Sequence, residues 1–167
     1  SAEIAKVSLN AYVTMKISFA NNLANICEKI PGANIDDITS SIGLDKRVSP
    51  YYIKGGMSFG GTCFPRDTYA FNRLSKDKEI STELFDAVTK INNYQDQHLA
   101  EIIISEMKRY NKKNIVILGT AFKKGTPVVE ESVGVKLLKN LLSNNLKKKI
   151  LVVDPLGLAS TKKIFKE

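Results

Sequence analysis

The segment around Cys63 has the residue types and spacing needed for covalent catalysis. Residues 58–67 read Ser-Phe-Gly-Gly-Thr-Cys-Phe-Pro-Arg-Asp, and the adjacent glycines would let the backbone approach a ligand closely. A helix N-terminus and the neighbouring cation of Arg66 both favour a nucleophilic thiolate. Asp67 lies one helical turn after Cys63, a spacing that suits a nucleophile and a general base for water. A buried structural cysteine after a glycine turn fits the spacing equally well.

Other polar residues could bind an anion or stabilise a developing negative charge. Lys6 and Asn10 form a second pair spaced by four residues, beside an apolar stripe. Taken alone, a lysine in this position is typical of a solvated surface. Arg47 and Lys54 flank the glycine-rich loop and could hold an anion together, although each alone is typical of surface charge.

The hydrophobic periodicity of the first two thirds of the chain predicts helices. Apolar residues spaced by three and four positions predict a long amphipathic helix over residues 2–29, and Asn34 is the expected N-cap of a short helix that ends at Gly43. Residues 44–65 are rich in glycine and proline and are expected to form an irregular loop. A short helix over residues 67–75 and a long one over residues 81–110 follow.

The period changes after Asn111. Residues 114–119 and 149–154 have the continuous apolar character of buried parallel strands, and residues 131–144 between them predict a helix. Two parallel strands cannot bury both faces unless further elements follow. The expected fold class is a mainly α domain over residues 1–111, followed over residues 112–167 by a partial α/β domain with a Rossmann-like βαβ unit.

Charge and composition exclude several classes of protein. The net charge of the 167 residues is +8, and all of this excess lies in residues 99–167, which hold 14 basic and 6 acidic side chains. A basic segment suggests a polyanionic partner, but the lysine runs 147–149 and 162–163 lack interleaved aromatic residues, so we expect no nucleic-acid binding. No apolar stretch is long enough for a bilayer. One histidine and two cysteines predict no metal site and a reducing, cytoplasmic location.

Four landmarks resemble the nucleotide-sugar dehydrogenases, and in particular those that act on UDP-glucose. Residues 58–67 resemble the family's Gly-Gly-x-Cys-x-x-Lys-Asp loop, and residues 2–12 resemble the Ala-Glu-x-x-Lys-x-x-x-Asn-x-Phe start of its central helix. Residues 119–124 and 153–155 resemble parts of its C-terminal UDP-binding domain. The predicted strand that ends at Gly119 is followed by Thr-Ala-Phe and so lacks the Gly-x-Gly-x-x-Gly pattern of a dinucleotide site. We therefore expect no NAD binding there.

The resemblance implies a chain that holds the family's central domain, residues 1–111, and part of its UDP-binding domain, residues 112–167. It implies a homodimer formed through the long helix 81–110. NAD would be bound mainly by an N-terminal domain outside this chain, so we expect no turnover by these residues alone.

The resemblance also implies a reaction and roles for individual residues. The C6 alcohol of UDP-glucose would be oxidised to the carboxylate of UDP-glucuronate in two NAD-dependent steps, with Cys63 as the nucleophile that forms a thiohemiacetal and then a thioester. Lys6 would stabilise oxyanions near C6, Asn10 would position water and Asp67 would be the base for that water. The residues implied to hold the UDP-sugar are Arg47, reaching from the partner subunit, with Tyr52, Lys54, Phe59, Gly60 and Lys123.

One departure from the family pattern leaves alternatives open. Glu130 stands where the family has an arginine that contacts NAD. The chain could therefore be a non-catalytic dimerisation or UDP-sugar-binding remnant. A dehydrogenase acting on GDP-mannose or on a UDP-N-acetyl sugar is a further alternative.

Overall fold

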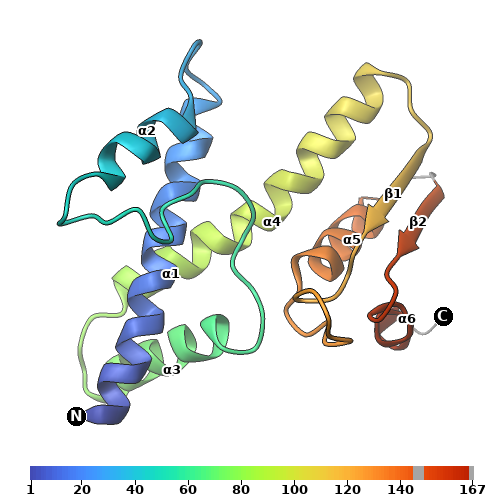
Figure 1. Cartoon of the computed structure of the whole chain (residues 1–167). Helices are drawn as coiled ribbons and strands as arrows, with labels where there is room; N and C mark the ends of the chain where they lie inside the picture. Colours follow the sequence, from blue (N-terminus) through green and yellow to red (C-terminus); the bar gives the residue numbers. More distant parts are fainter. Residues whose placement is uncertain (145–148, 166–167) are drawn as a thin grey trace. The chain divides into compact units, whose positions relative to one another are not determined.

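The computed structural model describes residues 1–144 and 149–165, which form six helices and one two-stranded parallel sheet (Figure 1). The chain divides into two compact units. Unit 1 contains Ser1–Phe59 and Cys63–Gln95, and unit 2 contains Gly60–Thr62 and the residues from Asp96 onward. The predicted fold class, a mainly helical part followed by a small α/β part, is confirmed. The domain boundary at residue 111 stays a prediction.

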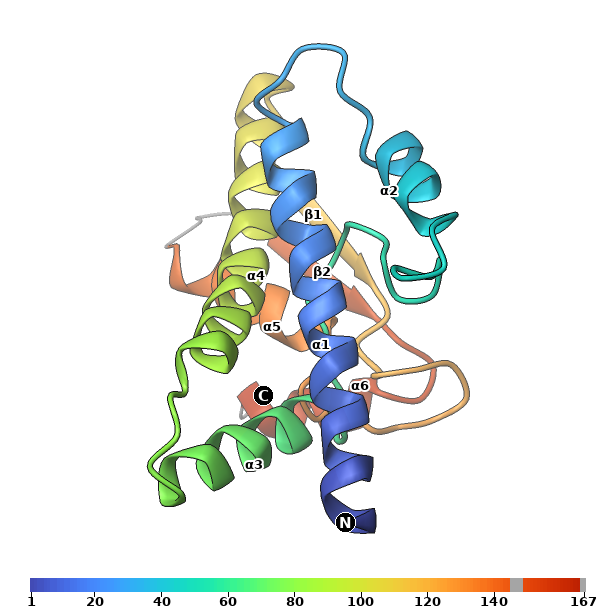
Figure 2. The same cartoon turned by 90° about the vertical axis from the view of Figure 1, so that its left-hand side faces the viewer.

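Helix α1 forms the axis of unit 1, with the other helices of the unit around it (Figures 1 and 2). The unit comprises α1 (Ala2–Cys27), α2 (Ile35–Gly43), α3 (Phe64–Asp77) and the first part of α4 (Glu83–Arg109). Asn34 caps α2 as predicted, because its side chain accepts a hydrogen bond from the backbone N–H of Asp36. The predicted helices and the irregular loop before α3 are confirmed to within a few residues. No helix in the described parts of the chain is long and apolar enough to cross a bilayer.

The buried face of α1 differs from the apolar stripe that marks this helix in the sequence. Phe19 and Ile26 of that stripe are 54% and 47% exposed. Besides Ala11, which belongs to the stripe, the buried face consists mainly of small and polar residues: Val13, Thr14, Ser18, Ala20, Asn21 and Cys27. Thr14 hydrogen-bonds to Thr68 of α3 at 2.9 Å, and Ser18 donates to the carbonyl of Val88 on α4 at 3.3 Å. Short side chains allow this close approach between helices and supply the hydrogen bonds.

Unit 2 is built on the parallel pair β1 (Asn114–Leu118) and β2 (Lys149–Val153), connected through α5 (Val133–Ser143). Its core combines the end of α4, one face of the sheet and α5: Ala100, Met107, Ile115, Ile117, Leu138 and Leu141. A further helix, α6 (Leu158–Phe165), follows β2. Helix α6 is not predicted by the sequence pattern, because Pro155 and Gly157 directly before it are turn-forming residues.

The prediction that both strands are buried is wrong for one face of the sheet. Burial alternates along β1, with Ile115 and Ile117 buried but Leu118 79% exposed. Leu151 and Val153 of β2 are exposed in the same way. The alternation arises because α4, α5 and Phe165 of α6 pack with one face of the sheet, whereas the side chains of the other face are exposed.

Candidate active site

Asp67, near the start of α3, receives polar contacts from three side chains. Asn10 donates from Nδ2 to Oδ2 of Asp67 at 2.6 Å, and Lys6, one turn earlier on α1, forms an ion pair with the same oxygen. Arg66 donates from Nε to Oδ1 at 3.2 Å. Asp67 itself is only 3% exposed. The structure therefore brings Lys6 and Asn10 to a carboxylate that lies 61 and 57 positions further along the chain.

These contacts fix the charge state of the cluster. The hydrogen bond from Lys6 is the largest cause that lowers the pKa of Asp67, burial opposes it, and Asn10 and Arg66 lower the pKa further. Asp67 is therefore ionised at neutral pH, which holds the Lys6 ammonium in place. The Lys6 side chain is 57% exposed, so its ammonium can also meet a ligand. A fixed cation of this kind stabilises an oxyanion.

Cys63 lies at the N-terminus of α3, one turn before Asp67. It is the N-cap residue of this helix and is exposed, whereas Cys27 is buried. The backbone N–H of Asp67 donates to the carbonyl of Cys63 at 2.9 Å, which closes the first helical turn. The predicted placement of Cys63 at a loop-to-helix transition is confirmed, and its role as nucleophile stays a prediction.

Two of the predicted substrate residues in unit 1 pack around Phe64, next to Cys63. The ring of Phe64 meets Tyr52 and Phe59 edge-on, with centroid distances of 6.2 and 6.5 Å. Phe59 is buried, while Tyr52 is exposed and has a φ of 60°. This left-handed conformation is costly for a non-glycine residue and is found at ligand sites more often than elsewhere. Lys54, two residues further on, is exposed to solvent.

Two other predicted substrate residues lie elsewhere on the chain. Arg47 is exposed and binds the carboxylate of Asp45 through both Nε and Nη2, the latter at 2.6 Å. Its predicted reach into a partner subunit stays a prediction. Lys123 belongs to unit 2 and lines a cavity of about 230 Å³ beside the carboxyl ends of the two strands, together with Lys124 and Asp154.

Gly60 and Gly61 belong to unit 2, and their neighbours there explain why they are glycines. A Cβ atom on Gly60 would lie 2.1 Å from the carbonyl oxygen of Glu131, and one on Gly61 would lie 2.1 Å from the ring of Phe122. Gly61 also donates its N–H to the Glu131 carbonyl at 3.2 Å. The chain itself therefore fills the space beside these two glycines, and the predicted contact of Gly60 with the UDP-sugar stays a prediction.

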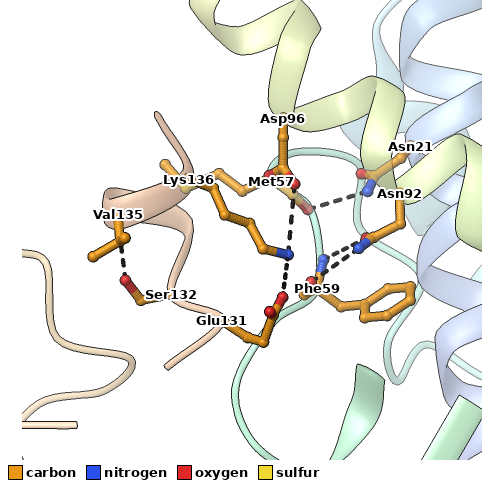
Figure 3. A network of polar contacts seen from close by, with 9 residues as sticks. All are labelled: Asn21, Met57, Phe59, Asn92, Asp96, Glu131, Ser132, Val135 and Lys136. Atoms are coloured by element: carbon orange, nitrogen blue, oxygen red, sulfur yellow. Dashed lines mark hydrogen bonds and ion pairs between the residues drawn. The ribbon is translucent and has the colours of Figure 1, made fainter. Parts of the chain in front are cut away.

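Glu131 is held in turn by Lys136 of α5, a contact that the sequence analysis missed. Lys136 Nζ lies 3.0 Å from Glu131 and 3.6 Å from Asp96, and points between the two carboxylates (Figure 3). The backbone of Glu131 has a φ of 52°, a strained value for this residue. Lys136 therefore holds Glu131, the strained residue whose carbonyl accepts the hydrogen bond from Gly61.

Asp154, directly after β2, has a structural role that the sequence did not indicate. Its Oδ2 accepts from the N–H groups of Thr120 and Ala121 at 2.6 and 2.8 Å, and its Oδ1 accepts from those of Leu156 and Gly157. These bonds hold the pKa of Asp154 far below its usual range. A carboxylate at the end of a second strand can bind the ribose of a dinucleotide, but this one is saturated by backbone. Together with the missing glycines, this makes the strand ends a poor fit for NAD.

Comparisons with known proteins agree on a family. Residues 1–94 match the profile of the UDP-glucose/GDP-mannose dehydrogenase family, central domain. A UDP-glucose 6-dehydrogenase of Rickettsia bellii is 37% identical over 166 residues, which cover 99% of this chain and 38% of the relative. A UDP-glucose dehydrogenase structure from Pyrobaculum islandicum matches with a TM-score of 0.87 at 30% identity, over 99% of this chain and 38% of that one.

A more distant structure shares the fold. It is a UDP-D-ManNAc dehydrogenase from Pyrococcus horikoshii, with a TM-score of 0.78 at 24% identity over 93% of this chain and 36% of that one. The chain thus spans less than two fifths of the length of these relatives.

Proposed function

Because the chain belongs to the UDP-glucose/GDP-mannose dehydrogenase family, we propose that it carries the sugar-oxidising centre of an enzyme that converts UDP-glucose to UDP-glucuronate. The observation that carries this proposal is the convergence of Lys6 and Asn10 on Asp67, one helical turn beyond the exposed Cys63. A nucleophile, a fixed cation and a polar group that can orient water then lie on two packed helices of one unit.

In the proposed reaction, Cys63 acts on the aldehyde that the first oxidation of C6 produces. The thiolate forms an S–C bond to C6, and the carbonyl electron pair moves to oxygen, where the Lys6 ammonium stabilises the oxyanion. The second oxidation removes a hydride from C6 and leaves a thioester. Water then adds to C6, the C–S bond breaks, and the thiolate and a carboxylate result, while two protons are released to solvent. NAD, the hydride acceptor that the resemblance implies, would be held by residues other than those at the ends of β1 and β2.

Asp67 has a narrower role in this proposal than the resemblance implies. Its lowered pKa makes it a weak base for the hydrolytic water. Both of its carboxylate oxygens also accept hydrogen bonds, from Lys6 and Asn10 on one side and from Arg66 on the other. We propose that Asp67 acts mainly by positioning Lys6 and Asn10.

On unit 1, the UDP-sugar would be held by Tyr52, Lys54 and Phe59. The same role for Gly60 and Lys123 of unit 2 is what the resemblance implies. Lys54 and Lys123 are exposed, and each adds a positive charge suited to a diphosphate. Arg47 would act from a partner subunit.

The proposed homodimer fits a surface on α1 better than the long helix 81–110. Exposed apolar residues on and just after α1 follow spacings of three, seven, seven and four positions: Leu9, Tyr12, Phe19, Ile26 and Ile30. These spacings place them in one stripe of a helical heptad pattern. The exposed apolar residues of α4 are eight to ten positions apart and form no such stripe: Leu84, Tyr94 and Ile102. We therefore place the dimer surface on α1.

Ligand-induced stabilisation tests the substrate class. UDP-glucose should raise the melting temperature of the wild-type chain, less so in Lys54→Ala and undiminished in Lys46→Ala, an exposed lysine of the same loop. A larger rise in melting temperature with GDP-mannose or with a UDP-N-acetyl sugar would identify that nucleotide sugar, instead of UDP-glucose, as the substrate. No rise with any of the three would contradict the proposal.

The non-catalytic alternative rests on Glu130, which is exposed where the family has an arginine. UDP-glucose binding without any reactivity of Cys63 would favour this alternative over the enzyme.

A further inference from the structure

The backbone just before the Cys63 loop is hydrogen-bonded by three buried carboxamide side chains. The segment is Gly56–Phe59, which belongs to no helix or strand. The three side chains are Asn21 on α1, and Asn92 and Gln95 on α4. Figure 3 shows Asn21 and Asn92 directed at Met57 and Phe59.

Asn92 makes a two-point contact with Phe59. Its Oδ1 accepts from the backbone N–H of Phe59 at 2.8 Å, and its Nδ2 donates to the backbone carbonyl of the same residue at 3.0 Å. Asn92 is 4% exposed. The side chain therefore does for Phe59 what a neighbouring strand would do in a sheet.

Asn21 and Gln95 hold Gly56 and Met57 in the same manner. Asn21 accepts from the N–H of Gly56 at 2.8 Å and donates to the carbonyl of Met57 at 3.1 Å. Gln95 donates to the carbonyl of Gly56 at 2.5 Å, while its own Oε1 accepts from Asn25 at 3.2 Å. Five backbone groups of the segment are thus bonded by side chains from two helices.

We propose that Asn21, Asn92 and Gln95, called the carboxamide clamp here, are positioning residues that fix the chain that presents Cys63. The proposal rests on the proposed role of Cys63 and of Phe59, four residues before it. A carboxamide both donates and accepts, which a carboxylate cannot do, so it satisfies a backbone N–H and C=O together. Since it does not titrate, the clamp keeps its geometry at every pH at which the protein is folded.

Residues of the same types occur next to the clamp without being buried. Asn22, Asn93 and Gln97 are exposed neighbours of the same types on the same helices. Asparagine is a poor helix former, and burying an amide is unfavourable unless it is hydrogen-bonded. The buried members are thus costly to the helices, and their bonds to the loop offset that cost.

The experiment compares Asn92→Asp with the matched control Asn93→Asp. At neutral pH the carboxylate introduced by Asn92→Asp would keep an acceptor for the Phe59 N–H but would face the Phe59 carbonyl with a charged oxygen. We expect exchange of the Phe59 amide to rise roughly fivefold or more, the equivalent of one hydrogen bond, with amides of β1 unchanged. Alkylation of Cys63 should change by a similar factor. Protonation of the new carboxyl at low pH should restore amide protection, an effect that a loss of packing would not produce.

Gln95→Glu, with Gln97→Glu as its control, tests the same clamp through one bond if Asn92→Asp does not fold. Neither readout needs UDP-glucose, so a wild-type chain that fails to bind UDP-glucose would refute the proposed function and leave the clamp standing. A folded Asn92→Asp variant with unchanged exchange of the Phe59 amide and unchanged Cys63 alkylation would overturn the clamp. A folded Gln95→Glu variant with unchanged Cys63 alkylation would do the same.

Discussion

Asn10 on α1 donates to Asp67 on α3 at 2.6 Å, although 57 positions separate the two residues. Lys6 reaches the same oxygen from one turn earlier on α1. Because Asp67 also lies in the first turn of the helix that Cys63 caps, this contact ties the proposed nucleophile to the proposed cation.

Removing the Lys6 charge should raise the pKa of Asp67. The Lys6 hydrogen bond is the largest cause that lowers this pKa, so Lys6→Met leaves burial opposed only by Asn10 and Arg66. Carboxyl chemical shifts in an NMR titration would measure the change. Lys29→Met, an exposed lysine just after α1, is the control.

The same substitution should change stability at acid pH. A lowered folded-state pKa gives stability that is present above the unfolded pKa of about 3.9 and is lost as the pH falls through the folded value. In Lys6→Met this contribution should therefore be smaller, and its loss should be complete at a higher pH than in the wild type. An unchanged Asp67 titration and an unchanged acid transition would show that the ion pair does not govern this carboxyl.

Gly61→Ala and Gly125→Ala form a matched pair, because their φ angles are 78° and 80°. Both substitutions impose the strain of a left-handed residue, about 1 kcal/mol. Only Gly61→Ala adds a clash, since nothing lies within 4 Å of a Cβ on Gly125. Because the half-exposed ring of Phe122 can shift, we expect Gly61→Ala to lower the free energy of unfolding by only about 1 kcal/mol more than Gly125→Ala. Equal values in urea unfolding would contradict the packing on Phe122.

Asp154→Ala should destabilise unit 2 by about 3 kcal/mol, because four backbone N–H groups lose their acceptor. Urea unfolding followed by circular dichroism measures this. The control is Asp77→Ala, which removes an exposed ion pair with Arg73 and should change the free energy of unfolding by less than about 1 kcal/mol. Similar changes in the free energy of unfolding for both variants would contradict the structural role of Asp154.

Phe19→Glu should turn the proposed dimer into a monomer, since it places a charge in the centre of the apolar stripe on α1. Leu84→Glu on α4 is the matched control and should leave the dimer intact. Sedimentation velocity distinguishes the two species. If only Leu84→Glu dissociated the dimer, the dimer surface would lie on the helix 81–110 and not on α1.

The periodicity of the sequence could predict the helices but not which face of each is buried. On α1 the large residue Phe19 is exposed and Asn21 is buried, because the close contact with α3 and the bonds to the loop favour short polar side chains. Spacing placed Lys6 with Asn10 and Cys63 with Asp67 on their own helices. That these two pairs lie close together follows from the packing of α1 against α3, and only the resemblance to the family predicted it. The carboxamide clamp has no spacing signal, since each amide binds backbone more than 30 positions away.

The alkylation rate of Cys63, measured by mass spectrometry with and without UDP-glucose, tests the central claim most directly. We predict rapid labelling of Cys63 at neutral pH while Cys27 stays inert, and slower labelling of Cys63 when UDP-glucose is present. Labelling of Cys63 at the same slow rate as Cys27, with no effect of UDP-glucose, would contradict the proposal that this chain carries the sugar-oxidising centre.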